Sequence, residues 1–369
     1  LKEVVDELYV DDAVDLAEEM PANVVKRILI QADAEKRKMI NTILQYPDDS
    51  AGSIMTTEFV ELRPKMTAEE AILHLRRSGI NKETINNCYI CAKGRQLMGV
   101  VTIRDLIMAS SEETMEDLME ENIISVSTLE DQETVARQFS KYGFLAMPVV
   151  DREERLVGIV TIDDVLDVME EETTEDIEKM AAIVPADKPY LKQTTFDLWK
   201  SRMPWLLLLM ISATFTGFII TSFEDALSKY VVLTAYIPML MDTGGNSGSQ
   251  ASVTVIRGIS LKEVEFRDIF RVIWKEVRVA LLCGLTLAVC NFGKLLLVDH
   301  LTILVAFTIC LTLFVTIFCA KVVGCTLPLI ASRLGFDPAV MASPFITTIV
   351  DAISLLVYFQ FATRLLGLG

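Results

Sequence analysis

The 369-residue chain is long enough for two or three domains, and with 51% hydrophobic residues it is neither an ordinary soluble protein nor a largely disordered one. Its net charge of −17 excludes a general nucleic-acid binder, which would present a basic face. Residues 1–200 carry 41 Asp and Glu against 22 Lys and Arg, whereas residues 201–369 carry 10 against 12. The sequence therefore predicts an acidic half exposed to water, joined to an apolar half in a membrane.

Residues 1–46 have the composition of an acidic helical segment, with Asp11 and Asp12 near its start and Pro21 at a helix boundary. The segment is similar to the final turns of a larger helical domain. Because the sequence begins with Leu1 and not with Met, we also expect the natural chain to be longer. Residues 47–52 contain Pro, Asp, Ser and Gly and are typical of a linker.

Residues 53–110 and 118–171 are two copies of one unit. The sequence GVVTIRDL, which begins at Gly99, recurs as GIVTIDDV, which begins at Gly158, and each copy opens with a methionine before an apolar strand, Met55 or Met119. The first copy has about five extra residues around positions 81–87. Apolar runs alternate with Ala/Glu-rich helical segments in the order strand, helix, strand, strand, helix, so we predict a paired α/β module.

A run of acids follows the second copy, because residues 163–180 contain nine acids and a single lysine. On a helix, five of these acids step by three or four positions and form one carboxylate stripe: Asp164, Asp167, Glu171, Glu175 and Glu178. Such a run is most often a solvated face. This run leads directly into the apolar half, and a divalent cation can cross-link its acids to carboxylates on a neighbouring element. We therefore favour a metal-sensing role for the acidic connecting helix and linker, residues 172–202.

Residues 203–369 predict five transmembrane helices, at about residues 203–223, 230–256, 276–298, 302–332 and 338–366. The first is an uncharged stretch of 21 residues, long enough to cross ~30 Å of hydrocarbon. The loop at residues 257–278 is rich in Lys and Arg, so the positive-inside rule places this loop and the acidic half in the cytosol. Five spans then place the C-terminus outside. We expect a multi-pass protein of the cytoplasmic (plasma) membrane.

Two polar features lie within the apolar half. Residues 238–250 combine Pro238 with three glycines, which predicts a broken helix. Irregular backbone at membrane depth occurs only where it lines a water-filled cavity or is buried in protein. Backbone carbonyls freed by such a break, together with the side chains of Asn246 and Gln250, can then replace part of an ion's hydration shell. The alternative is a close helix crossing that requires small residues.

The second polar feature is a carboxylate near the middle of the last predicted helix. Placing the charged side chain of Asp351 at that depth of the membrane costs a few kcal/mol, so it requires a partner or a path for water. Thr347 and Asp351 are four residues apart and share one helical face, with Thr348 alongside. Hydroxyl and carboxylate oxygens are hard donors that suit Mg²⁺ or Ca²⁺. The alternative is that Asp351 simply pairs with Lys321.

The repeated unit resembles a tandem pair of CBS domains, a regulatory module that often binds adenine nucleotides. The resemblance implies that Thr102 and Asp105 contact ribose, with Arg104 beside them and Phe144 stacked on the base. The aromatic residue expected at the opposite wall is replaced by Asn86 and Asn87. A repeat that packs and binds no ligand is the alternative to ATP binding.

Taken together, the helical piece, the paired repeats, the acidic helix and the five spans resemble the MgtE family of magnesium channels over essentially the whole chain. The resemblance implies a multidomain fold: an α-helical N-terminal fragment, an α/β tandem CBS pair, an acidic connecting helix, and an all-α five-helix transmembrane domain. It also implies a homodimer in membrane lipid, with one pore at the two-fold interface that Mg²⁺ bound between the cytosolic domains closes.

The family's functional residues can be carried over by position. In the pore, Asp351 would hold hydrated Mg²⁺ and Asp337 would face the cytosolic mouth, with donors nearby at Thr347, Thr348, Gly245 and Asn246. The predicted gating ligands are Asp164, Asp167, Glu171, Glu172, Glu175 and Asp176 on the connecting helix, Glu130 and Glu133 in the second repeat, and Asp11 or Asp12, reaching across to Asp164.

Four alternatives to a Mg²⁺ channel remain. A broader transporter of Co²⁺, Mn²⁺ or Ca²⁺ uses the same chemistry. A CBS-regulated anion channel or secondary transporter fits poorly, because Asp351 is acidic and residues 238–250 contain no basic residue. A membrane-anchored nucleotide sensor would need neither Asp351 nor the glycines. An enzyme is least expected, because the sequence presents no nucleophile–base pair and no complete zinc-ligand set.

Overall fold

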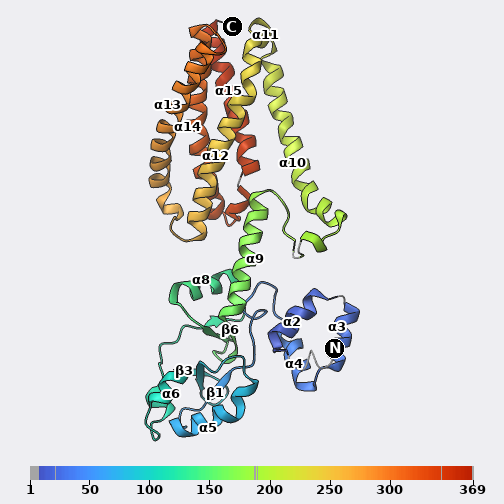
Figure 1. Cartoon of the computed structure of the whole chain (residues 1–369), viewed down its shortest axis with the longest axis vertical. Coiled ribbons are helices and arrows are strands. Elements are labelled where there is room, and N and C mark those ends of the chain that lie inside the picture. The colour runs from blue at the N-terminus through green and yellow to red at the C-terminus, as the bar shows by residue number, and fades with distance from the viewer. Residues whose placement is uncertain (1–7, 21, 187, 189, 342, 368–369) are drawn as a thin grey trace. The chain divides into compact units, whose positions relative to one another are not determined.

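The computed structural model describes residues 8–20, 22–186, 188, 190–341 and 343–367. The chain divides into two compact units, Leu1–Glu172 and Thr173–Gly369, and each is described by itself. The first unit contains short helices and two small sheets, and the second is a bundle of long helices (Figure 1). The expected multidomain fold class is confirmed.

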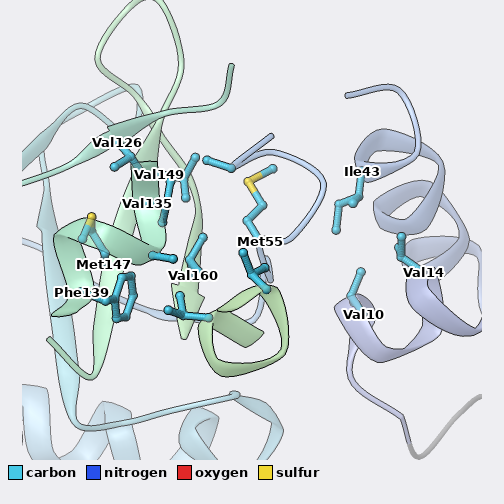
Figure 2. Packing of buried hydrophobic residues seen from close by; sticks show 14 of the residues in the cluster. Val10, Val14, Ile43, Met55, Val126, Val135, Phe139, Met147, Val149 and Val160 are labelled. Carbon is cyan, nitrogen blue, oxygen red and sulfur yellow. The ribbon is translucent and has the colours of Figure 1, made fainter. Parts of the chain in front are cut away.

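Three short helices open the first unit: α2 (Val10–Glu19), α3 (Ala22–Gln31) and α4 (Ala34–Ile43). Their apolar faces belong to one hydrophobic cluster with the second repeat. Figure 2 shows Val10, Val14 and Ile43 on these helices, and Val160 among the strands of the repeat, with Met55 between the two groups. The N-terminal helices are therefore fixed to the second repeat by buried apolar contacts.

Each repeat folds as predicted into a three-stranded sheet with helices. The first has β1 (Val60–Leu62), α5 (Ala68–Ser78), β2 (Asn87–Cys91), β3 (Leu97–Thr102) and α6 (Ile103–Met108). The second has α7 (Met115–Leu118), β4 (Val126–Ser127), α8 (Gln132–Tyr142), β5 (Ala146–Val150), β6 (Leu156–Thr161) and α9 (Ile162–Met180). In both sheets the first strand runs parallel to the second, which pairs antiparallel with the third.

The two repeats interlock through the recurring methionines and glycines of the sequence. A Cβ built on Gly99 of the first repeat would lie 2.5 Å from Sδ of Met119, which opens the second. The reciprocal contact exists too, because a Cβ on Gly158 would lie 2.6 Å from Sδ of Met55. Each methionine therefore occupies the space left by a glycine in the other repeat, which explains why both residues recur.

The second unit is built from α10 (Thr195–Ser222), α12 (Ile237–Ser260), α13 (Ile269–Leu297), α14 (Ile303–Arg333) and α15 (Ser343–Leu366). Short connecting elements are η2 (Tyr190–Lys192), α11 (Glu224–Lys229), η3 (Val231–Tyr236), η4 (Phe266–Asp268) and η5 (Pro338–Met341). Helix α14 is the most buried, and it packs against α12, α13 and α15 (Figure 1). Among the described residues, four helices are long and apolar enough to cross a membrane: α10, α13, α14 and α15. The fifth predicted span, α12, carries too many polar and small residues to meet that test.

The predicted break at residues 238–250 is wrong, because α12 runs as a continuous helix from Ile237 to Ser260. Pro238 lies in the first turn, where its missing N–H removes no helical hydrogen bond. The glycines are needed for packing: a Cβ on Gly248 would lie 2.8 Å from Cγ2 of Ile346 and 3.1 Å from the carbonyl oxygen of Ala320. The structure instead has the alternative, a close helix crossing that requires small residues, so no backbone carbonyls of α12 are freed there.

The bounds of two helices also differ from those expected. Helix α10 begins at Thr195, eight residues before the predicted start at 203, because Thr194 and Asp197 form a capping box. The acidic helix α9 begins at Ile162, inside the second repeat, and ends at Met180. The acidic stripe is therefore anchored in the repeat at its first end.

Candidate cation sites

A polar stripe runs along one face of α12. Asp242, Asn246 and Gln250 follow at intervals of four residues, and all three are exposed. Asn246 Nδ2 donates to Asp242 Oδ1 at 3.1 Å. The opposite face, which includes Gly244 and Gly248, is buried against the neighbouring helices. One side of α12 therefore packs in the bundle, and the other presents amide and carboxylate oxygens outward.

Asp351 lies on α15, which packs beside α12. Its carboxylate is half-buried and close enough to Asp242 for the two charges to repel each other. Within the described parts of the chain, Asp351 makes no hydrogen bond or ion pair. The alternative pairing with Lys321 is wrong, because the buried Lys321 has its Nζ 3.8 Å from Oε2 of the partly buried Glu276 on α13.

The predicted threonines lie one turn before Asp351. Thr347 and Thr348 each donate to the carbonyl oxygen of Pro344, at 2.9 and 3.0 Å. Their hydroxyl oxygens keep lone pairs that can accept from a water molecule. Gly245 packs on Thr347, since a Cβ there would lie 3.0 Å from Thr347 Cγ2. The structure thus brings Gly245 and Thr347 together at the contact between α12 and α15.

Asp337 immediately precedes the short η5 element, which leads into α15, and it contacts the end of α9. Its Oδ2 lies 2.7 Å from Lys179 Nζ, and its Oδ1 accepts from the backbone N–H of Ala339 at 2.8 Å. The same ammonium lies 2.7 Å from Glu175 Oε1. Burial alone would lower the pKa of Lys179, but hydrogen bonds to Asp337 and Glu175 outweigh it and raise that pKa above its ordinary 10.5. The ammonium is therefore charged at any physiological pH.

A second group of acids lies in the first unit, where Asp11 of α2 approaches Asp164 of α9. Burial, to which the charge of Asp12 adds, raises the pKa of Asp11 from 3.8 to about 6. Burial, with the neighbouring charges of Asp11 and Asp163, raises the pKa of Asp164 from 3.8 to about 7. Of the two predicted candidates, Asp11 is buried and Asp12 is exposed. Asp11 is therefore the residue that reaches toward Asp164.

Glu83 is a third member of this group, and it is not among the residues predicted from the sequence. Burial raises its pKa from 4.5 to about 8, and the charges of Asp11 and Asp164 add to that rise. Its Oε2 is buried with no hydrogen-bond partner among the described residues. Glu83 lies in the extra segment of the first repeat, around positions 81–87, which was the one available signal. We call Asp11, Glu83 and Asp164 the acidic cluster.

No three Asp, Glu, His or Cys side chains in the described ranges lie close enough together to bind a metal ion directly. This spacing does not conflict with Mg²⁺, which dehydrates reluctantly and usually keeps several waters. Carboxylates that contact a hydrated ion through its waters stand farther apart than direct ligands. The acidic cluster and the Asp242–Asp351 pair are candidates for contact with a divalent cation through its water molecules.

The remaining predicted gating acids lie on α9, on α8 and just before α8. Asp167 and Glu171 are exposed, Asp176 is partly buried, and Glu172 Oε1 accepts from Gln132 Nε2 at 3.0 Å. In the second repeat, Glu133 pairs with Arg137 at 3.1 Å, and Glu130 accepts from Gln138 at 3.2 Å. The predicted stripe is therefore divided, with Asp164 in the acidic cluster and Glu175 at Lys179.

The predicted nucleotide residues have structural roles in the repeats. Thr102 and Asp105 form the capping box of α6, with Thr102 Oγ1 2.5 Å from Asp105 Oδ2. Arg104 is exposed, and the ring of Phe144 packs edge-on against Phe139. A cavity of about 650 Å³ in the first repeat is lined by other residues, among them Phe59, Arg63, His74 and Arg95.

Comparison with known proteins matches both halves of the chain. A sequence model described as a divalent cation transporter matches residues 237–361, the MgtE intracellular N domain matches residues 1–49, and the CBS domain matches residues 51–112 and 115–171. The chain is 40% identical over 334 residues to the magnesium transporter MgtE of Thermus thermophilus, an alignment that covers 90% of this chain and 74% of that protein. It is 38% identical over 360 residues to MgtE of Bacillus subtilis, covering 96% of this chain and 78% of that protein.

Among solved structures, the cytosolic domain of the Mg²⁺ channel MgtE in complex with ATP is 40% identical, with a TM-score of 0.44 and coverage of 45% of this chain and 68% of that chain. The alignments with the two sequence relatives cover both the repeats and the helical bundle, and these relatives are transporters, not enzymes. The chain therefore belongs to the MgtE family of divalent cation transporters.

Proposed function

We propose that this protein carries Mg²⁺ into the cytosol through a pore formed at the two-fold interface of a homodimer. The observation that carries the proposal is the polar stripe of α12 beside Asp351, exposed on an otherwise apolar bundle. Polar groups at membrane depth are costly unless they face water or protein. A second copy that brings the same face to the two-fold axis would enclose both stripes around a hydrated path.

Two Asp351 carboxylates facing each other across such an axis favour a doubly charged ion. Without a cation they repel, and one is protonated more readily. With Mg²⁺ between them the charges are neutralised, while the ion keeps its inner waters. The same arrangement accepts other divalent cations, so a broader specificity for Co²⁺, Mn²⁺ or Ca²⁺ is the alternative that a competition measurement must separate.

The membrane potential supplies the driving force for uptake. An inward-moving divalent ion gains about 4.6 kcal/mol per 100 mV of inside-negative potential, twice the value for a single charge. ATP hydrolysis is then unnecessary. The proposed orientation places the acidic half and the basic loop at residues 257–278 in the cytosol, and with five spans the C-terminus lies outside.

Cytosolic Mg²⁺ would close the pore by neutralising the acidic cluster and the acids of α9. At low Mg²⁺, Asp11, Glu83 and Asp164 repel one another, which favours separation of α2 from α9. At high Mg²⁺ the ion bridges them and favours the compact, closed state. Shifting a two-state equilibrium from 1:99 to 99:1 requires about 5.5 kcal/mol of differential binding, which several weak sites can share.

The central test is uptake by the full-length protein reconstituted in liposomes that contain a Mg²⁺-sensitive dye. An inside-negative potential should drive uptake without ATP, and Asp351→Ala should abolish it or reduce its selectivity. Glu263→Ala, an exposed acid on a connecting loop, is the control and should transport as the unmodified chain does. Equal uptake by Asp351→Ala and the control would reject the proposed pore.

Binding of ATP at the paired repeats stays a prediction for this chain. It is tested by calorimetry of the full-length protein with ATP, with and without Mg²⁺. Thr102→Ala should weaken binding if the loop at the start of α6 holds the ribose, whereas no heat at millimolar ATP would favour a repeat that only packs.

A further inference from the structure

Lys179 occupies an unusual position among the acids of α9. It is the single lysine among nine acids at residues 163–180, and it lies in the last turn of the helix. Its ammonium is 2.7 Å from Glu175 Oε1 and 2.7 Å from Asp337 Oδ2. Glu175, which is predicted to bind a gating cation, and Asp337, which is predicted to face the cytosolic mouth of the pore, are thus already bridged by a positive charge that belongs to the chain itself.

The contact is reinforced by the next residue. Met180 packs against Ile256 of α12 and Ala339 of η5, and both of those side chains are buried. The end of α9 therefore meets the membrane bundle through an ion pair and an apolar contact together. Because the side chain of Lys179 is only 23% exposed, solvent screens this ion pair less than a surface pair.

Asp337 connects this contact to the proposed pore. The other carboxylate oxygen of Asp337 accepts from the N–H of Ala339, which fixes the start of η5. The end of η5 is held to α12, because Ser252 Oγ donates to the carbonyl oxygen of Met341 at 3.2 Å. Helix α15, which carries Asp351, follows directly after η5. A cation that holds Asp337 to Glu175 therefore holds α9 to the element that starts the pore helix.

We propose that Lys179 is a built-in cation that holds α9 on the cytosolic mouth of the bundle when Mg²⁺ is scarce, and that a divalent cation must displace it to bind Glu175 and Asp337. This inference rests on the proposed function, in which cytosolic Mg²⁺ closes the channel.

Charge balance makes the two cations mutually exclusive. Glu175 and Asp337 together carry two negative charges, which Mg²⁺ alone would neutralise. Lys179 alone leaves one negative charge on the pair, and both cations together would leave a net positive charge at a contact that is only partly exposed to solvent, which is costly. Lys179 therefore supports closure at low Mg²⁺ and opposes Mg²⁺ binding at the same pair.

The test is single-channel recording of the full-length protein in lipid bilayers, with the cytosolic solution either free of Mg²⁺ or saturated with it. Lys179→Met removes the charge and keeps much of the apolar stem. Lys179→Arg keeps a charge that can bridge both carboxylates. Lys192→Met, at an exposed lysine of η2, is the matched control. If Lys179→Met does not elute as a folded protein, Lys179→Gln replaces it.

In Mg²⁺-free solution, Lys179→Met should raise the open-to-closed ratio by roughly fivefold, the effect of losing ion pairs worth about 1 kcal/mol. Lys179→Arg and Lys192→Met should match the unmodified channel. In saturating Mg²⁺, Lys179→Met should close as fully as the unmodified channel, because the divalent ion replaces the ammonium.

Two results would overturn the inference alone: an unchanged ratio for Lys179→Met without Mg²⁺, or incomplete closure of that variant at saturating Mg²⁺, which would indicate a purely structural lysine. An unmodified channel that Mg²⁺ does not close would overturn the proposed gating together with the inference.

Discussion

Gly324 of α14 and Gly248 of α12 lie at a close crossing of the two helices: a Cβ built on Gly324 would lie 2.2 Å from the carbonyl oxygen of Gly248. Real side chains do not occupy such a position, so the backbones would have to separate. The polar stripe of α12 lies on the same helix, and the crossing therefore sets where Asp242 and Asn246 are presented.

Gly324→Ala should destabilise the bundle by more than about 2 kcal/mol, because overpacking at a backbone contact forces the helices apart. Gly293→Ala, on α13, is the matched control, since a Cβ there meets nothing within 4 Å and alanine favours a helix. Thermal unfolding in detergent measures both variants. Equal midpoints for the two would contradict the assigned crossing.

The acidic cluster predicts a stability that depends on pH. The folded-state pKa values of Asp11, Asp164 and Glu83 lie above their ordinary values, so between about pH 4 and pH 8 the folded state binds more protons than the unfolded state. Without Mg²⁺ the free energy of unfolding should therefore fall as the pH rises through this range. Added Mg²⁺ should restore stability most strongly at the high-pH end.

Asp164→Asn tests the origin of that dependence. The variant should be more stable than the unmodified chain at about pH 8 without Mg²⁺, and it should respond less to pH. Asp48→Asn, an exposed acid of the linker, should leave the slope unchanged. A slope that Asp164→Asn does not alter would show that the cluster has no part in it.

The ion pair between Glu276 and Lys321 predicts an asymmetric effect within the membrane bundle. Glu276→Gln leaves the buried Lys321 ammonium without its carboxylate, which costs about 3–5 kcal/mol. Glu263→Gln changes an exposed acid near the same helix and should cost almost nothing. The yield of folded protein and its unfolding midpoint in detergent distinguish the two, and a stable Glu276→Gln protein would contradict the pairing.

The gating account predicts that Asp164→Ala combined with Asp167→Ala leaves conduction intact and weakens closure by cytosolic Mg²⁺. Fewer carboxylates are then available to bind Mg²⁺ in the compact state, so Mg²⁺ stabilises that state less. Recordings from excised patches over a range of Mg²⁺ measure the shift. Unchanged closure would reject the role assigned to these acids.

The sequence predicts features that repeat or that carry local patterning. The paired modules were evident because GVVTIRDL and GIVTIDDV recur, and the long helices because apolar stretches match the membrane thickness. The acidic helix was evident as well, since its carboxylates repeat at helical spacing. In each case the information lies within a few turns of chain.

Features that depend on distant partners were missed. From the sequence, the glycines of α12 predict a broken helix. Their actual role is close packing against Gly324 of α14 and Ile346 of α15, which are distant in the sequence. Glu83 was not singled out, since its neighbours Asp11 and Asp164 come together only in the folded unit. In the sequence, Lys179 is only a single base among acids. Its role in joining α9 to Asp337 depends on a contact between residues that are distant in the chain.

The most direct test of the central claim is a cryo-EM map of the protein in a lipid environment at high Mg²⁺. The account predicts a two-fold dimer in which the two Asp351 carboxylates face each other across the axis, with density for a hydrated ion between them. Asp351 side chains turned toward lipid, or paired with a lysine away from any two-fold axis, would contradict it.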